Sequence, residues 1–248
     1  MPHRFARHLT GSVRSRRGDI QLGLALAFIA GAINAGGFLA VGQYTSHMTG
    51  VLSTVADLIA LHKFHAALIS VLFVACFICG AITSSVVISW GRARKFHSEF
   101  ALALMLEALL LLVFAFYADN LFRQAESSIN TIIALLCFIM GLQNAIITKI
   151  SSAEIRTTHV TGLVTDIGIE LGKYIYSSGS KALRAEVKFK KLALHSGLVC
   201  SFLSGGIIGA TAFNIFGTTA AIPFAIILML MASVPVLDDL RGRKLDKD

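Results

Sequence analysis

Apolar side chains dominate the chain in long runs that short polar segments separate. A helix needs roughly 20 apolar residues to cross a hydrocarbon core of about 30 Å. Runs near or above that length predict membrane-spanning helices at residues 21–42, 65–90, 99–118, 129–148, 192–216 and 218–237. Two shorter segments with a helical pattern, 49–61 and 160–172, would each rise only about 20 Å, which is too little to cross unaided.

The composition agrees with this pattern. Hydrophobic residues make up 55% of the 248 residues and charged residues only 15%, whereas soluble domains carry about 25% charged residues. The net charge of +8 could suggest nucleic-acid binding, but the basic residues lie in short clusters between apolar runs, as membrane topology requires. The sequence therefore predicts an all-α polytopic membrane protein in a lipid bilayer, with no nucleic-acid partner.

The basic residues also distinguish two topologies, because Lys and Arg accumulate on the cytoplasmic side of a membrane. If both short segments enter the membrane and return, twenty Lys and Arg lie on the cytoplasmic side and only Lys63 and Arg123 lie outside. If both cross, the count becomes seventeen against five. The count favours six transmembrane helices plus two re-entrant half-helices over eight spans, and both topologies place the termini in the cytoplasm.

Three short blocks recur in the same order in the two halves of the chain. The pairs are GAINA (31–35) with GLQNA (141–145), SHMTGVLS (46–53) with THVTGLVT (158–165), and FICGA (77–81) with FLSGG (202–206). Three crossings in each half would insert the second half upside down, which gives an inverted-topology repeat of the kind many secondary transporters use. The predicted units are a basic cytoplasmic segment 1–20, repeat 1 at 21–118, repeat 2 at 129–237 and a cytoplasmic tail 238–248.

Two motifs resemble the YoaK family of uncharacterised bacterial membrane proteins. They are SHMTG at 46–50 and GLQNAIITKISSAEIRTTHVTGLVTDIGIELGK at 141–173, and the resemblance covers nearly the whole chain. The family often has Asn after the first Thr-Gly, where this chain has Val51. The resemblance implies a multi-pass protein of the bacterial inner membrane and supplies no activity.

The repeated Thr-Gly motif has the composition of a half-helix beginning. Ser and Thr hydroxyls can cap a helix, glycine permits close backbone approach, and His and Asn side chains nearby can bind a solute or satisfy the interrupted backbone. Two such beginnings meeting near the bilayer midplane would attract an anion. The candidate substrate-binding residues are Asn34, Ser46, His47, Thr49, Gly50, Asn144, Thr158, His159, Thr161 and Gly162. The alternative is that the small and hydroxyl residues only pack helices together.

Four carboxylates lie within the apolar or half-helical segments and are candidates for proton or ion coupling: Asp57, Glu107, Asp166 and Glu170. Ionisable groups at membrane depth are costly and are often functional. For Glu170 the alternative is a simple ion pair with Lys173, and Asp57 lies close enough to the outer end of its segment to reach water. Glu107 is expected to face the bundle interior.

The leading hypothesis is a membrane transporter or channel for a small solute, anionic solutes included, with proton coupling as a further element. We expect no catalytic residues, no metal site and no cofactor, because two His without nearby Cys or paired carboxylates are a poor ligand set. An intramembrane enzyme, for which Ser46 beside His47 is the only suggestive pair, and a non-transporting membrane partner or sensor remain as alternatives. The expected partners are lipid and a small-molecule or ion substrate, and a homo-oligomer is left open.

Overall fold

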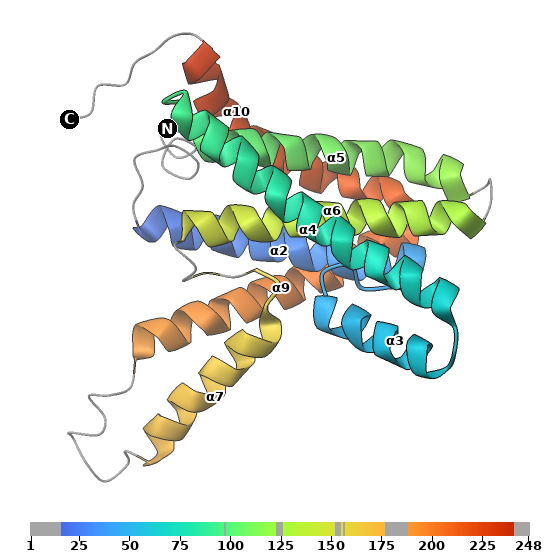
Figure 1. Cartoon of the computed structure of the whole chain (residues 1–248). Coiled ribbons are helices and arrows are strands. Elements are labelled where there is room, and N and C mark those ends of the chain that lie inside the picture. Colours follow the sequence, from blue (N-terminus) through green and yellow to red (C-terminus); the bar gives the residue numbers. More distant parts are fainter. Residues whose placement is uncertain are drawn as a thin grey trace.

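The computed structural model describes residues 16–96, 98–122, 126–151, 155, 157–176 and 188–240. In this part of the chain all regular secondary structure is helical (Figure 1). The helices are α2 (Arg16–Val41), α3 (Met48–Ala60), α4 (Phe64–Ala93), α5 (Glu99–Phe122), α6 (Glu126–Ile150), α7 (Val160–Tyr176), α9 (Phe189–Phe216), the short 3-10 helix η2 (Gly217–Ala221) and α10 (Ile222–Leu240). The prediction of an all-α protein is confirmed. Residues 1–15 and 241–248, which belong to the two predicted cytoplasmic ends, lie outside the described residues.

Five segments of the described chain are long and apolar enough to cross a membrane. They are Arg16–Val41, Phe64–Ala93, Glu99–Ala118, Ile129–Ile150 and Phe189–Leu237. The last segment contains two helices, α9 and α10, joined by η2. The chain turns between them at Gly217, whose φ of +61° is one that residues with a Cβ rarely adopt.

The helix pair α2 and α9 is held by reciprocal glycine contacts. Gly31 of α2 lies directly against the backbone carbonyl of Phe202, and Gly205 of α9 lies against the backbone carbonyl of Phe28. Along the rest of the contact Gly197 lies near Leu24, Gly209 against Ala32 and Gly36 against Phe213, so residue numbers rise together and the two helices run parallel. Because no side chain separates the two backbones, van der Waals contact extends along the interface in the way that small residues permit in membranes.

The pair α4 and α6 repeats this arrangement with the other copies of the recurring blocks. Gly80 of α4 lies against the backbone carbonyl of Phe138, and Gly141 of α6 lies against that of Phe77. These helices also run parallel. In both pairs the first helix of one half of the chain therefore packs against a later helix of the other half.

Helices α5 and α10 pack side by side and antiparallel (Figure 1). The N–H and the hydroxyl of Ser98, just before α5, donate to Asp239 near the end of α10, at 2.8 and 2.6 Å. At the other end, the Thr218 hydroxyl donates to the Ala115 carbonyl at 3.2 Å. These polar bonds at both ends tie α10 to α5.

The short helices α3 and α7 begin near the middle of the molecule and run toward opposite ends (Figure 1). Helix α3 has 13 residues and packs on α4, while α7 has 17 residues and packs on α9. Their lengths correspond to a rise of about 20 and 25 Å. Two short helices therefore bring their N-terminal ends toward the centre of the molecule.

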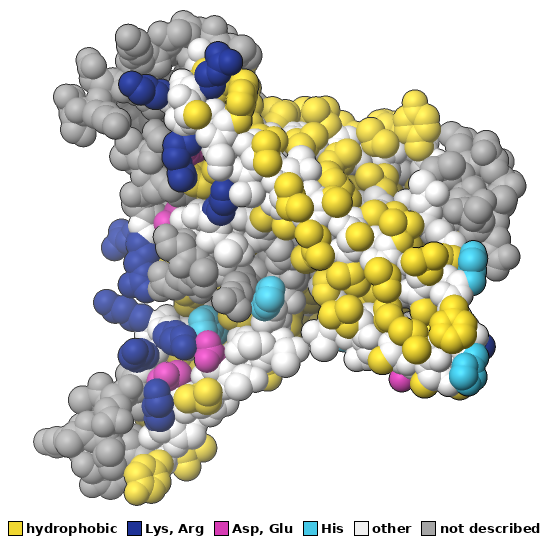
Figure 2. Space-filling view, viewed as in Figure 1, with side chains coloured by type: hydrophobic (Ala, Val, Ile, Leu, Met, Phe, Trp, Pro, Cys, Tyr) yellow, Lys and Arg dark blue, Asp and Glu magenta, His cyan; other side chains and the backbone are white. Residues whose placement is uncertain are grey.

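Charge is distributed unevenly along the helix axes. Lys and Arg gather along one end of the visible face, beside a broad hydrophobic surface (Figure 2). That end comprises the beginnings of α2 and α9 and the ends of α4, α6 and α7. A hydrophobic belt next to a basic end is the surface expected of a protein embedded in a bilayer.

Candidate functional site

An asparagine on the preceding helix holds the start of each interrupted helix. The Oδ1 atom of Asn34 in α2 accepts from the N–H of Ser46 at 3.2 Å and from its hydroxyl at 2.9 Å. The Oδ1 atom of Asn144 in α6 accepts from the hydroxyl of Thr158 at 2.7 Å. Each Asn thus bridges a membrane helix to the stretch of chain just before α3 or α7. Asn34 also satisfies an interrupted backbone N–H, which was one of the two roles left open by the sequence.

The structure corrects the expectation that these hydroxyls cap the helices. Residue His47 is the N-cap of α3, and its side chain makes no capping hydrogen bond. Ser46 and Thr158 lie one residue before their N-cap positions, so their hydroxyls reach the Asn amides rather than the first free N–H groups of the helix. The expectation that Gly162 permits a close backbone approach is also wrong, because a side chain added there would meet nothing within 4 Å.

A cavity of about 490 Å³ lies where the two helix beginnings converge. Its polar lining comes from both repeated motifs and from α2, and its apolar lining comes mainly from α9. The lining residues are Asn34, Ala35, Tyr44, Ser46, His47, Thr158, Val160, Thr161, Phe202, Leu203, Gly206, Ile207 and Ala210. Five of the ten sequence candidates line it directly: Asn34, Ser46, His47, Thr158 and Thr161.

The other sequence candidates lie around this cavity rather than in its lining. Thr49 is exposed. Gly50 lies beneath the imidazole of His47, and both residues line a neighbouring cavity of about 330 Å³. Asn144 acts through its bond to Thr158. His159 directly precedes α7 and its carbonyl accepts the first bond of that helix, from the N–H of Leu163.

Sequence reasoning missed the wall that α9 contributes. Phe202 and Gly206 belong to the FLSGG block, which was recognised as a repeat but was not assigned to the site. Tyr44 was missed as well, although it lies two residues before the first motif. The recurrence of FLSGG after the Thr-Gly motif, in the same order as FICGA in the first half, was the signal that could have placed α9 at the site.

Ser46 and His47, the pair considered for an intramembrane enzyme, do not form a nucleophile and base in the described contacts. The Ser46 hydroxyl donates to the Asn34 amide oxygen, which is not basic enough to remove a proton. The imidazole of His47 lies over Gly50. This geometry favours a binding role for both side chains over a catalytic one.

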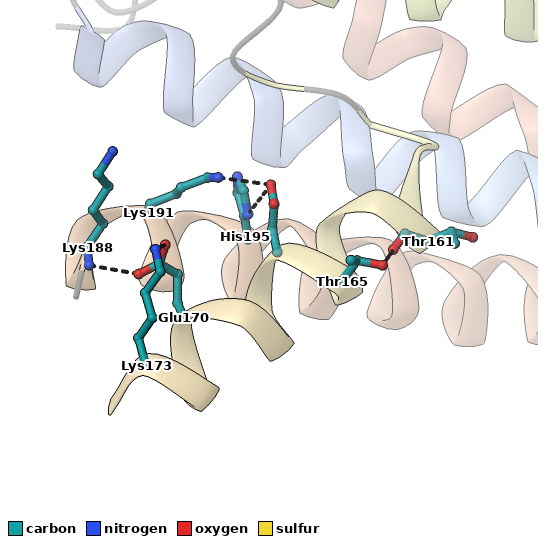
Figure 3. A network of polar contacts seen from close by, with 8 residues as sticks. Thr161, Thr165, Glu170, Lys173, Lys188, Lys191 and His195 are labelled. Atoms are coloured by element: carbon teal, nitrogen blue, oxygen red, sulfur yellow. Dashed lines mark hydrogen bonds and ion pairs between the residues drawn. The ribbon is translucent and has the colours of Figure 1, made fainter. Parts of the chain in front are cut away.

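Two of the four candidate carboxylates join α7 to α9 (Figure 3). Glu170 accepts from the backbone N–H of Lys188 at 2.9 Å and from the ammonium group of Lys173 at 3.0 Å. Asp166 lies 3.1 Å from Lys191 Nζ and 3.5 Å from His195 Nδ1, both on α9. The Glu170–Lys173 pair is the structural alternative that the sequence had offered.

Hydrogen bonds to its charged form lower the pKa of Glu170. The backbone N–H of Lys188 is the largest cause, and the ammonium group of Lys173 is the next. Glu170 therefore remains ionised near neutral pH. Its carboxylate lies against the N-terminal end of α9, where a negative charge is favoured. Its stabilising contribution is present above the ordinary Glu pKa and is lost as the pH falls through the lowered value.

The remaining two carboxylates lie apart from the cavity lining. Asp57 is exposed near the end of α3. Glu107 is 0% exposed within α5, where its carboxyl group faces the side chain of Gln143 in α6. The expectation that Glu107 faces the bundle interior is confirmed.

Comparison with known proteins assigns the chain to a family. The family described as "Protein of unknown function (DUF1275)" matches residues 22–234. The chain is 26% identical over 171 residues to the UPF0700 transmembrane protein YoaK of Bacillus subtilis (strain 168), covering 68% of this chain and 75% of that protein. No solved structure matches.

Proposed function

From the premise that this chain belongs to the DUF1275 family of transmembrane proteins, we propose that it is a transporter or channel for a small solute. One observation carries the proposal: the two copies of a repeated polar motif, 112 residues apart from Ser46 to Thr158, line one cavity. Its volume of about 490 Å³ falls within the range of about 300–1,000 Å³ usual for small-molecule sites.

The proposed architecture is six membrane crossings plus two re-entrant half-helices, related as inverted repeats. Three observations support it. Helices α9 and α10 are separate helices of 28 and 19 residues. Helices α3 and α7 are short and run in opposite directions (Figure 1). The pairs α2–α9 and α4–α6 use matching glycine contacts. Exchanging the two halves of the chain maps each of these pairs onto the other.

The proposed solute is small and carries an anionic or carboxylate group. The hydroxyl of Thr161 and the imidazole of His47 offer donors, and the first turns of α3 and α7 add N–H groups that have no partner within their own helix and carry partial positive charge. No Lys, Arg, Asp or Glu is among the described residues that line the cavity. Walls formed by Phe202 and Ile207 suit an apolar part of the same solute.

Proton coupling is proposed at the α7–α9 junction. Asp166 and His195 lie 3.5 Å apart, and α7 also carries Thr161 at the cavity. A change of charge on Asp166 or His195 would alter the contact between the two helices that wall the solute cavity. Glu107 is a second candidate because its carboxyl group is fully enclosed, whereas Glu170 is held by its bonds to α9.

Uptake into proteoliposomes tests the function. The purified full-length chain is reconstituted, and uptake of radiolabelled acetate, benzoate, phosphate and chloride is compared with protein-free liposomes, with and without an inward proton gradient. We expect saturable uptake of at least one organic carboxylate. Binding without accumulation of any probe, or turnover of a probe, would favour the sensor or the enzyme instead.

Labelling of Lys63 tests the architecture and the proposed orientation in the bacterial inner membrane with cytoplasmic termini. Cys76, Cys79, Cys137 and Cys200 are first replaced, since all four are free thiols. In intact cells a membrane-impermeant maleimide is expected to label Lys63→Cys, and to label Lys173→Cys only after permeabilisation. If Lys63→Cys reacts only from the cytoplasm, the two halves run the same way up and the inverted arrangement is wrong.

A further inference from the structure

A second cavity, of about 620 Å³, lies between the first turns of α2 and α9. It is distinct from the solute cavity and lies at the end of the molecule where Lys and Arg gather (Figure 2). Its described lining combines three basic residues with an apolar floor: Arg16, Arg17, Ile20, Leu24, Lys190, Ala193, Leu194 and Gly197. The basic residues lie at the helix beginnings, and the apolar residues follow within the next two turns.

The charges of this second cavity favour an anion. Arg16, Arg17 and Lys190 contribute three positive charges, and Asp19 in the same turn of α2 contributes one negative charge. Two positive charges remain even if Asp19 pairs with one of the arginines. Guanidinium and ammonium groups bind phosphate oxygens through charge-assisted hydrogen bonds.

The apolar floor distinguishes this cavity from a simple basic surface. Ile20 and Leu24 lie one turn apart on α2, and Ala193 and Gly197 lie one turn apart on α9, so both helices present apolar atoms along the groove. A free phosphate would use the basic rim only. A phospholipid would place its headgroup at the rim and an acyl chain along the apolar floor, toward the membrane interior.

We propose that the groove between the first turns of α2 and α9 binds an anionic phospholipid, with the phosphate at Arg17 and Lys190. The basic residues of the groove lie at the helix beginnings and its apolar residues follow in the next turns, which is the order in which a lipid headgroup and its acyl chain would lie. It also borders the α2–α9 pair, whose later turns carry Asn34 and Phe202 of the solute cavity. The bound lipid therefore braces the helix pair that forms one wall of that cavity. The proposal does not depend on transport.

Native mass spectrometry of the full-length protein in detergent tests the proposal. The protein is titrated with phosphatidylglycerol and, separately, with phosphatidylcholine of the same acyl chains. We expect tighter binding of phosphatidylglycerol, and a loss of about tenfold or more in its affinity for the double variant Arg17→Gln plus Lys190→Gln.

A matched control and a second variant keep the result interpretable. The control is Arg94→Gln plus Lys95→Gln, which removes the same charge from the turn after α4, and its affinity is expected to stay within about twofold of wild type. Ala193→Trp fills the groove without changing charge and should weaken phosphatidylglycerol binding. Inorganic phosphate should compete only weakly with phosphatidylglycerol for the wild-type protein. Equal binding of the two lipids, an equal loss in the control, or full competition by inorganic phosphate would each overturn the lipid site.

Discussion

Gly205→Ala is expected to separate α9 from α2 and to destabilise the protein substantially. A Cβ at this position would overlap the backbone carbonyl of Phe28. Backbone atoms cannot move aside as the end of a flexible side chain can, so the helices must shift apart along the whole contact. Overpacking in a core costs about 1–3 kcal/mol, and a backbone clash belongs at the upper end of that range. The measurement is the unfolding midpoint of the purified protein in detergent.

The neighbouring Gly206 supplies the control. A Cβ there would lie 3.6 Å from the Ala35 Cβ, an ordinary van der Waals contact. Gly206→Ala is therefore expected to change stability by no more than about 0.5 kcal/mol, and the helix propensity of alanine favours it. Gly141→Ala in the α4–α6 pair should resemble Gly205→Ala, because it overlaps the carbonyl of Phe77. Equal midpoints for Gly205→Ala and Gly206→Ala would contradict the close backbone contact.

The long helices could be predicted from the sequence because each one is an apolar run of sufficient length, and α3 and α7 could be predicted from their helical pattern. Helix α10 illustrates this. The apolar character continues through Gly217, and the predicted spans nevertheless ended and began on either side of that residue. Which helices pair could not be predicted in this way. Periodicity shows that Gly31 and Phe202 lie in helices, but their contact depends on a fold that joins residues 171 positions apart.

The site was predictable in part because duplication made its polar residues visible. The matching positions of Ser46 and Thr158 indicated a shared role, and both line the cavity. Their hydrogen-bond partners were less predictable, since a difference of one residue in the helix start converts a cap into a bond to Asn34 or Asn144. The apolar wall was not predicted, because Phe202 lies in an apolar helix and its sequence context does not distinguish it from a lipid-facing residue.

Removing two hydroxyls from the solute cavity is expected to weaken transport by about tenfold or more. The double variant Ser46→Ala plus Thr161→Val deletes one hydroxyl from each motif and keeps the side chains nearly the same size. The Ser46 hydroxyl already donates to Asn34, so the direct donor to the solute is the Thr161 hydroxyl. A hydrogen bond to a charged group contributes about 1.5–3 kcal/mol, so the loss of the Thr161 bond to the solute gives an effect of that size. The affected quantity should be KM for the carboxylate that wild-type proteoliposomes accumulate, because the Thr161 hydroxyl binds the solute and the Ser46 hydroxyl holds its side of the cavity through Asn34 throughout the cycle.

Ser53→Ala plus Thr165→Val is the matched control, since it makes the same two changes within the same two recurring blocks, 46–53 and 158–165. The Ser53 hydroxyl donates to the Thr49 carbonyl at 3.0 Å and the Thr165 hydroxyl to the Thr161 carbonyl at 2.9 Å, so both serve their own helix. Neither residue lines the cavity. Uptake by this control should match wild type, and both double variants should retain the wild-type unfolding midpoint to within a few degrees. If both double variants raise KM equally, the hydroxyls act through helix stability. If only the cavity variant does so, the convergence of the two motifs is the binding site.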